Sequence, residues 1–183
     1  MNTYHILALS GSLRKGSYNT ALVRAFQKLA PEGVTVEIAD ISTLPLFNQD
    51  EEANFPPAAA ALKEKIEHAD GIIVATPEYN RSIPGVLKNA IDWTSRPYGQ
   101  GAWNGKAVYV IGASIGPIAA ALAQADLKKT MLFMNAIVLG QPEFYLGVAG
   151  SKFDEAGNLI DEDTEKHIKK AFEAFTAFIE KVR

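Results

Sequence analysis

The sequence predicts an α/β protein with one doubly wound parallel sheet of five strands and helices on both faces. Short apolar runs rich in branched residues alternate with longer segments of helical periodicity. The segments between successive runs are long enough for right-handed crossovers between parallel strands. With 48% hydrophobic and 21% charged residues, the 183-residue chain suits one globular domain, which we place at residues 1–183.

Five apolar runs have the length and composition of strands. Gly71–Ala75, with the sequence GIIVA, contains no polar residue, which is typical of a strand buried on both faces. The predicted strands are Tyr4–Leu9, Val34–Ile38, Gly71–Ala75, Lys106–Gly112 and Ala136–Leu139.

Five segments have helical spacing of their apolar residues. The last is the clearest, because one apolar stripe runs along it, acidic residues begin it and basic residues end it. The predicted helices are Asn19–Leu29, Ala58–His68, Gly85–Trp93, Pro117–Phe133 and Asp163–Val182.

At this length, the usual arrangement of such elements is the flavodoxin-like strand order 2-1-3-4-5. Ligands of these sheets bind beyond the carboxyl ends of the strands, at the switch point between strands 1 and 3. The segments expected to form a site are therefore Ser10–Asn19, Thr76–Pro84 and Gly112–Pro117.

The loop after the first strand has the composition of a phosphate cradle. Its glycines let backbone N–H groups turn inward, its serines add donors, and the start of the next helix favours negative charge. Arg14 can add a charge-assisted hydrogen bond. The sequence therefore predicts an anionic group at this loop.

Three other interpretations of the loop remain open. Gly11 and Gly16 have the spacing of a P-loop, but Ser17 stands where the lysine should be. A dinucleotide fingerprint would need glycine in place of Leu13, although Asp40 after the second strand fits one. The third interpretation is an ordinary serine-rich turn that caps a helix.

The loop after the third strand can hold a flat heteroaromatic ring. Pro77 and Pro84 restrict its backbone to a few shapes, and Tyr79 can cover one face of a ring. Together, the segments GSLRKGSYN (Gly11–Asn19), PEYNRSIPGVLKNAIDW (Pro77–Trp93) and SRPYGQGAWNGK (Ser95–Lys106) closely resemble the NAD(P)H-dependent FMN reductases. That family includes bacterial quinone and chromate reductases and related azoreductases.

The resemblance covers nearly the whole chain. It implies an enzyme that binds FMN and passes two electrons from NADH or NADPH to small acceptors such as quinones, chromate, azo or nitro compounds. Two alternatives stay open: an electron-carrier flavodoxin, and an FMN reductase that supplies free reduced flavin to a partner. The net charge of −3 argues against the strongly acidic face of a flavodoxin.

The resemblance also implies the residues that contact FMN. Four would hold the phosphate: Ser12, Arg14, Ser17 and Asn19. Their loop also contributes Ser10, Leu13 and Tyr18. The ring and ribityl chain would be framed by Pro77, Glu78, Tyr79, Asn80 and Ser82, with Ser114 and Ile115 at the other edge. No side chain is expected to act as a catalytic acid or base.

One segment departs from the family pattern. Many members have a glycine pair after the fourth strand, in a stretch like SxGxxGG, whereas this chain has Ala113-Ser114-Ile115-Gly116-Pro117. Pro117 is expected in the first turn of the following helix. The contacts of this loop with a flavin are left open.

The remaining features limit the partners and the location. The absence of cysteine excludes disulfides and cysteine-ligated metal sites, and the three histidines fall on three different elements, so no metal site is expected. The mild charge favours neither nucleic acid nor a membrane surface. The apolar run Ile6–Leu9 is too short for a signal peptide, which predicts a cytoplasmic protein. The resemblance implies a homodimer or homotetramer through helix Gly85–Trp93, whose apolar residues exceed one buried stripe.

Overall fold

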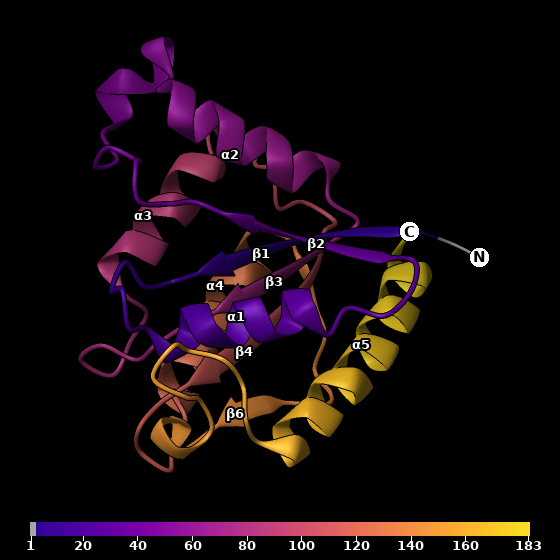
Figure 1. The fold of residues 1–183 in the computed structure, drawn as a ribbon. Helices are drawn as coiled ribbons and strands as arrows, with labels where there is room; N and C mark the ends of the chain where they lie inside the picture. Colours follow the sequence, from indigo (N-terminus) through magenta and orange to yellow (C-terminus); the bar gives the residue numbers. More distant parts are fainter. Residues whose placement is uncertain (1–2) are drawn as a thin grey trace.

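The computed structural model describes residues 3–183 and contains the predicted parallel sheet (Figure 1). The strands are β1 (Tyr4–Ser10), β2 (Val34–Ala39), β3 (Gly71–Ala75), β4 (Ala107–Ala113), β5 (Ile137–Val138) and β6 (Phe144–Leu146). Their order is β2-β1-β3-β4-β5, with β6 also pairing with β4, and every pairing is parallel. The predicted strand order is confirmed.

Helices cover both faces of the sheet because successive strand residues point to opposite sides. The helices are α1 (Tyr18–Lys28), α2 (Pro57–His68), α3 (Gly85–Thr94), α4 (Ala121–Phe133) and α5 (Glu162–Val182), with short 3-10 helices at Gln49–Asn54 and Ala149–Ser151. On one face, α1 and α5 pack against Ile73 of β3. On the other face, α2, α3 and α4 pack against Ile72 and Val74.

The last part of the sheet differs from the prediction. The expected fifth strand, Ala136–Leu139, is reduced to Ile137–Val138, and the unpredicted β6 pairs with the carboxyl end of β4. Between them lies Gly140-Gln141-Pro142, where the proline has no N–H to donate to a ladder. The break therefore divides one strand position into two short strands.

Helix α4 also begins later than predicted. Ala119 and Ala120 have φ angles of 55° and 60°, which lie in the left-handed region, so the helix begins at Ala121. The expectation that Pro117 stands in its first turn is wrong.

Within residues 3–183, no helix combines the length and apolar character needed to cross a membrane.

Helix α5 approaches the sheet closely at Gly71. A Cβ atom at this position would lie 2.6 Å from Cδ1 of Ile179 and 2.8 Å from Cζ of Phe175. Both side chains are fully buried and cannot swing away. Glycine is therefore required at the start of β3 so that α5 can lie against the strand.

We expect Gly71→Ala to lower the free energy of unfolding by about 1–3 kcal/mol, because overpacking forces the helix away from the sheet. Gly140→Ala is the matched control, since a Cβ there meets nothing within 4 Å. The control should change stability by less than about 0.5 kcal/mol. Urea denaturation measures both, and equal effects would show that the contact with α5 does not limit stability.

Candidate functional site

Three loops meet at the carboxyl end of the sheet, as the strand order requires. The N–H of Gly11, after β1, donates to the carbonyl of Ala75 at 2.8 Å. The N–H of Thr76, after β3, donates to Ile111 of β4 at 3.0 Å. These bonds extend the ladder past the strand ends, so the predicted segments after β1, β3 and β4 lie next to one another.

The loop between β1 and α1 presents unused donors. Ser17 is the N-cap of α1, and its hydroxyl accepts from the N–H of Thr20 at 3.3 Å. Four backbone N–H groups of this loop have no acceptor within the described part of the chain. They belong to Ser12, Leu13, Lys15 and Gly16. Free amides at the start of an eleven-residue helix fit a phosphate group.

Arg14 curls over the same loop. Its Nη2 donates to the carbonyl of Gly16 at 2.7 Å, and its own carbonyl accepts from the N–H of Ser17 at 3.1 Å. The side chains of Leu13 and Arg14 are exposed, and Ser12 is half-buried. These three residues therefore stand where a ligand can reach them.

Three further predicted residues lie beneath the loop. Ser10 shares a hydrogen bond of 2.8 Å with the hydroxyl of Thr20, and Tyr18 stacks on Phe153. Asn19 is 3% exposed, and its amide makes two bonds of 2.9 Å with the backbone N–H and carbonyl of Ala113 in β4. These side chains hold the loop in place from below.

The loop after β3 ends in a tight hairpin. Tyr79 and Ser82 exchange backbone hydrogen bonds of 3.0 and 3.1 Å. Between them, Asn80 and Arg81 have φ angles of 52° and 66°, which is the pattern of a type I′ turn. Tyr79 is 49% exposed at this turn, so its side chain is available to cover a flat ligand.

The hairpin is attached to the start of α4. One carboxylate oxygen of Glu78 accepts from the N–H groups of Leu122 and Ala123, at 3.0 and 3.2 Å. Ala120, the N-cap of α4, has no polar side chain, so Glu78 satisfies the donors that a local cap would otherwise satisfy. Pro77, just before Glu78, is buried, and its carbonyl accepts from Thr76.

A second bond joins the same two elements. The hydroxyl of Ser82 donates to Asp126 of α4 at 2.8 Å. That hydrogen bond, together with the ammonium of Lys129, holds the pKa of the Asp126 carboxyl below its ordinary value. The side chains of Glu78 and Ser82 therefore fix the hairpin relative to α4.

The loop after β4 is fixed by the strand that the sequence did not reveal. The N–H of Ser114 donates to Leu146 of β6 at 3.0 Å, and its carbonyl accepts from Ala149 at 2.9 Å. Ile115 is left 75% exposed. The SxGxxGG pattern, counted from Ser114, places its glycine pair at Ala119 and Ala120, where the chain adopts the left-handed conformation that glycine favours.

Exposed apolar side chains gather on these loops and on the segments bonded to them. Val148, for example, donates its N–H to the carbonyl of Gly116 at 3.3 Å. The group, called the apolar rim below, consists of Leu13, Tyr79, Ile115, Ile118, Leu122 and Val148. Unused amide donors and an apolar rim at one edge suit a ligand with an anionic tail and a flat ring.

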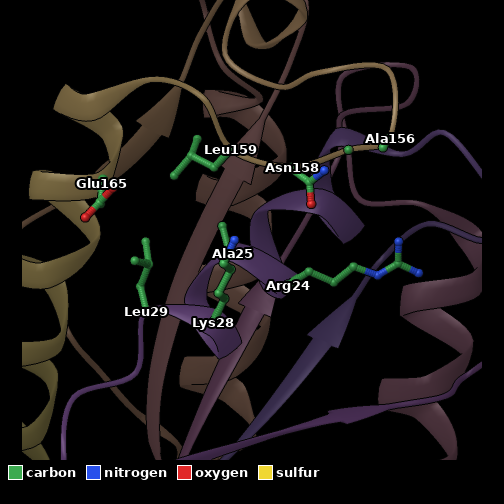
Figure 2. Close-up of a pocket in the computed structure, with 9 residues that line it drawn as sticks. Arg24, Ala25, Lys28, Leu29, Ala156, Asn158, Leu159 and Glu165 are labelled. Atoms are coloured by element: carbon green, nitrogen blue, oxygen red, sulfur yellow. The ribbon is translucent and has the colours of Figure 1, made fainter.

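Three surface hollows differ in whether they reach the residues of the first loop. The one in Figure 2, of about 210 Å³, lies between α1 and Ala156–Leu159 and includes none of the predicted site residues. Its neighbour of about 270 Å³ reaches Gly16, Ser17 and Tyr18. A hollow of about 610 Å³ lies between Leu13, residues 41–47 and α3.

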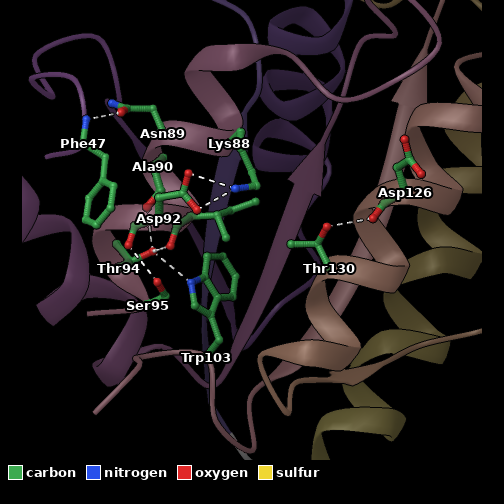
Figure 3. A network of polar contacts seen from close by, with 11 residues as sticks. Phe47, Lys88, Asn89, Ala90, Asp92, Thr94, Ser95, Trp103, Asp126 and Thr130 are labelled. Atoms are coloured by element: carbon green, nitrogen blue, oxygen red, sulfur yellow. Dashed lines mark hydrogen bonds and ion pairs between the residues drawn. The ribbon is translucent and has the colours of Figure 1, made fainter. Parts of the chain in front are cut away.

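Helix α3 is held by polar contacts along its length (Figure 3). Trp103 is fully buried, and its Nε1 donates to the hydroxyl of Thr94 at 2.9 Å, so it anchors the loop before β4. Most apolar residues of the helix pack inside the protomer, whereas Val86 is half-buried and lines the hollow of about 610 Å³. The residues that pack in the protomer core are Leu87, Ala90, Ile91 and Trp93.

Comparison with known proteins places the chain in a family. The pattern of the family described as NADPH-dependent FMN reductase matches residues 4–151. A 2-hydroxy-1,4-benzoquinone reductase of Burkholderia is 42% identical over 95% of this chain and 95% of its own. An NAD(P)H-dependent FMN reductase of Pseudomonas aeruginosa is 42% identical over 97% of this chain and 96% of its own.

A solved structure agrees with both. FerB, a flavoenzyme NAD(P)H:(acceptor) oxidoreductase from Paracoccus denitrificans, superposes with a TM-score of 0.90 at 42% identity, covering 98% of each chain. The free amides of the first loop and the apolar rim are groups that FMN can use. The chain is an FMN-dependent oxidoreductase that uses NAD(P)H, and it belongs to the NADPH-dependent FMN reductase family.

Proposed function

We propose that the chain reduces quinones by two electrons taken from NAD(P)H. The observation that carries the proposal is the edge where free backbone amides of the first loop lie beside an apolar rim. The rim can hold a flat acceptor against a flavin ring. The benzoquinone reductase from Burkholderia supports quinones as acceptors, and the family resemblance extends the range to chromate, azo and nitro compounds.

Within this proposal, the first loop binds the FMN phosphate. Ser12, Arg14 and Ser17 supply side-chain donors, and the backbone amides complete the cradle. Asn19 serves by keeping the start of α1 against β4. Ser10 and Tyr18 support the loop, and Leu13 shields it.

The other two loops orient the ring. Pro77–Ser82 would face it with backbone groups and with Tyr79, while Ser114 and Ile115 border its other edge. When bound, FMN supplies the redox chemistry, accepting hydride from NAD(P)H and delivering two electrons to the acceptor. The protein's part is to bind, to orient and to exclude water, and no side chain is required as acid or base.

We also propose that residues 1–183 form one domain. The chain forms a homodimer or a dimer of dimers, and it works in the cytoplasm. The support for association is the hollow of about 610 Å³ beside α3, where Leu46 is 86% exposed. A protruding leucine beside an apolar hollow suits a two-fold contact. Use of NAD(P)H, an intracellular coenzyme, supports the location.

The function is tested by reducing FMN-loaded protein anaerobically. We expect one equivalent of NADPH or NADH per subunit to bleach the visible flavin absorption without any acceptor. Adding 1,4-naphthoquinone should then restore it. A flavin that stays oxidised under NAD(P)H would contradict the proposal and favour an electron carrier reduced by another protein.

We expect Ser17→Asp to weaken FMN binding at least about tenfold, since a lost hydrogen bond to a charged group costs about 1.5–3 kcal/mol before any repulsion. Aspartate is itself a good N-cap, so the helix should remain stable. Ser17→Asn is the matched control, because it keeps the cap and adds no charge. Fluorescence quenching of FMN measures the dissociation constants, and equal values for all three proteins would place the phosphate elsewhere.

We expect Leu46→Glu to shift the protein toward monomers, because a carboxylate at an apolar subunit contact is costly to bury. Ile160→Glu is the control at an exposed apolar residue away from the hollow. Light scattering at micromolar concentration measures the mass of each. A native protein that is already monomeric would refute the proposed association.

A further inference from the structure

Arg81 occupies a position that favours glycine. It is the second central residue of the type I′ turn, with a φ angle of 66°, and Asn-Gly is the preferred pair at such a turn. Asn80 fits the first position, but a residue with a long side chain at the second costs conformational free energy. Strained backbone of this kind often occurs at functional sites, so we infer a role for the Arg81 side chain.

The guanidinium of Arg81 is accessible to a ligand. Its side chain is 70% exposed, and its ion pair within residues 3–183 is with Glu78, at 3.3 Å. The other carboxylate oxygen of Glu78 is already engaged by the amides of Leu122 and Ala123. An exposed pair of this geometry contributes little, so Arg81 can exchange it for a stronger partner.

Besides the carboxylates of Glu78 and Asp126, the elements around Arg81 carry exposed apolar side chains. Tyr79, in the same hairpin, and Leu122, bonded to the same carboxylate of Glu78, both belong to the apolar rim. The nearby carboxylate of Asp126 is bound by Ser82 and Lys129. The hairpin therefore presents the exposed guanidinium of Arg81 beside a surface that suits a flat ring.

We propose that Arg81 selects electron acceptors that combine a planar quinone ring with an anionic substituent. This rests on the proposed quinone reductase function. In the net reaction, NAD(P)H would supply a hydride equivalent and water a proton, so that the quinone becomes a hydroquinone and NAD(P)+ and hydroxide are left. Its anionic substituent keeps its charge throughout, so Arg81 stabilises the bound acceptor and the transition state alike.

This uniform binding predicts which kinetic constant changes. Losing Arg81 should raise KM for an anionic acceptor and leave kcat nearly unchanged. The charge should also raise the encounter rate, and added salt should reduce that advantage. A neutral quinone should be insensitive to both.

The test uses Arg81→Gly as the FMN-loaded protein with 1,4-naphthoquinone and its 2-sulfonate. We expect kcat/KM for the sulfonate to fall about tenfold, as for loss of one charge-assisted contact, with less than about twofold change for the neutral quinone. The melting temperature should not fall, because glycine adopts this turn without strain. Arg81→Lys should recover part of the sulfonate activity.

Lys129→Gln is the matched control, because it removes a cation that is 78% exposed on α4 without changing the turn. It should affect both quinones equally. Equal losses on the two quinones in Arg81→Gly would overturn the proposal. A fall in kcat/KM confined to NADPH or NADH would also overturn it, because the cation would then bind the donor.

Native protein that reduces neither quinone would refute the proposed function itself. That result differs from an Arg81→Gly variant that reduces both quinones with the same preference as the native protein, which would refute only the role of Arg81.

Discussion

The carboxylate of Glu78 is the contact on which the geometry of the proposed ring site depends. Helix α4 starts from a left-handed alanine pair and has no polar residue at its N-cap, so its first amides need an acceptor from elsewhere. Glu78 provides it from a loop 44 residues earlier, at Leu122. The hairpin that carries Tyr79 is thereby fixed to the helix that follows the loop of Ile115.

The strand order and the three loops could be predicted because they depend on local patterns. Apolar runs set the strands, and a parallel sheet brings the loops after strands 1, 3 and 4 to one edge whatever the side chains are. The loops proposed to hold the phosphate and the ring could also be predicted, since glycine, serine and proline act on the backbone next to them. The resemblance of these segments to a known family then predicted FMN as the cofactor.

What the sequence could not reveal depends on contacts between distant residues. Strand β6 has only three residues, and its pairing with β4 is decided by where Gln141-Pro142 sends the chain. The late start of α4 follows from two alanines in a conformation that alanine rarely adopts. The sequence of α3 contains more apolar residues than one buried stripe needs, which predicted a subunit contact. In the fold, residues from other segments, among them Trp103, pack against these side chains within the same protomer.

The paired bonds between Asn19 and Ala113 have a consequence for motion. They join the start of α1 to β4, which lies two strands away from β1 across β3. The loop between β1 and α1 is therefore restrained from opening as a local flap, because the residue at the start of α1 is bonded to the carboxyl end of β4. Hydrogen exchange at the Ala113 amide should then report sub-global opening, and cofactor release should follow that slow event rather than loop fluctuation.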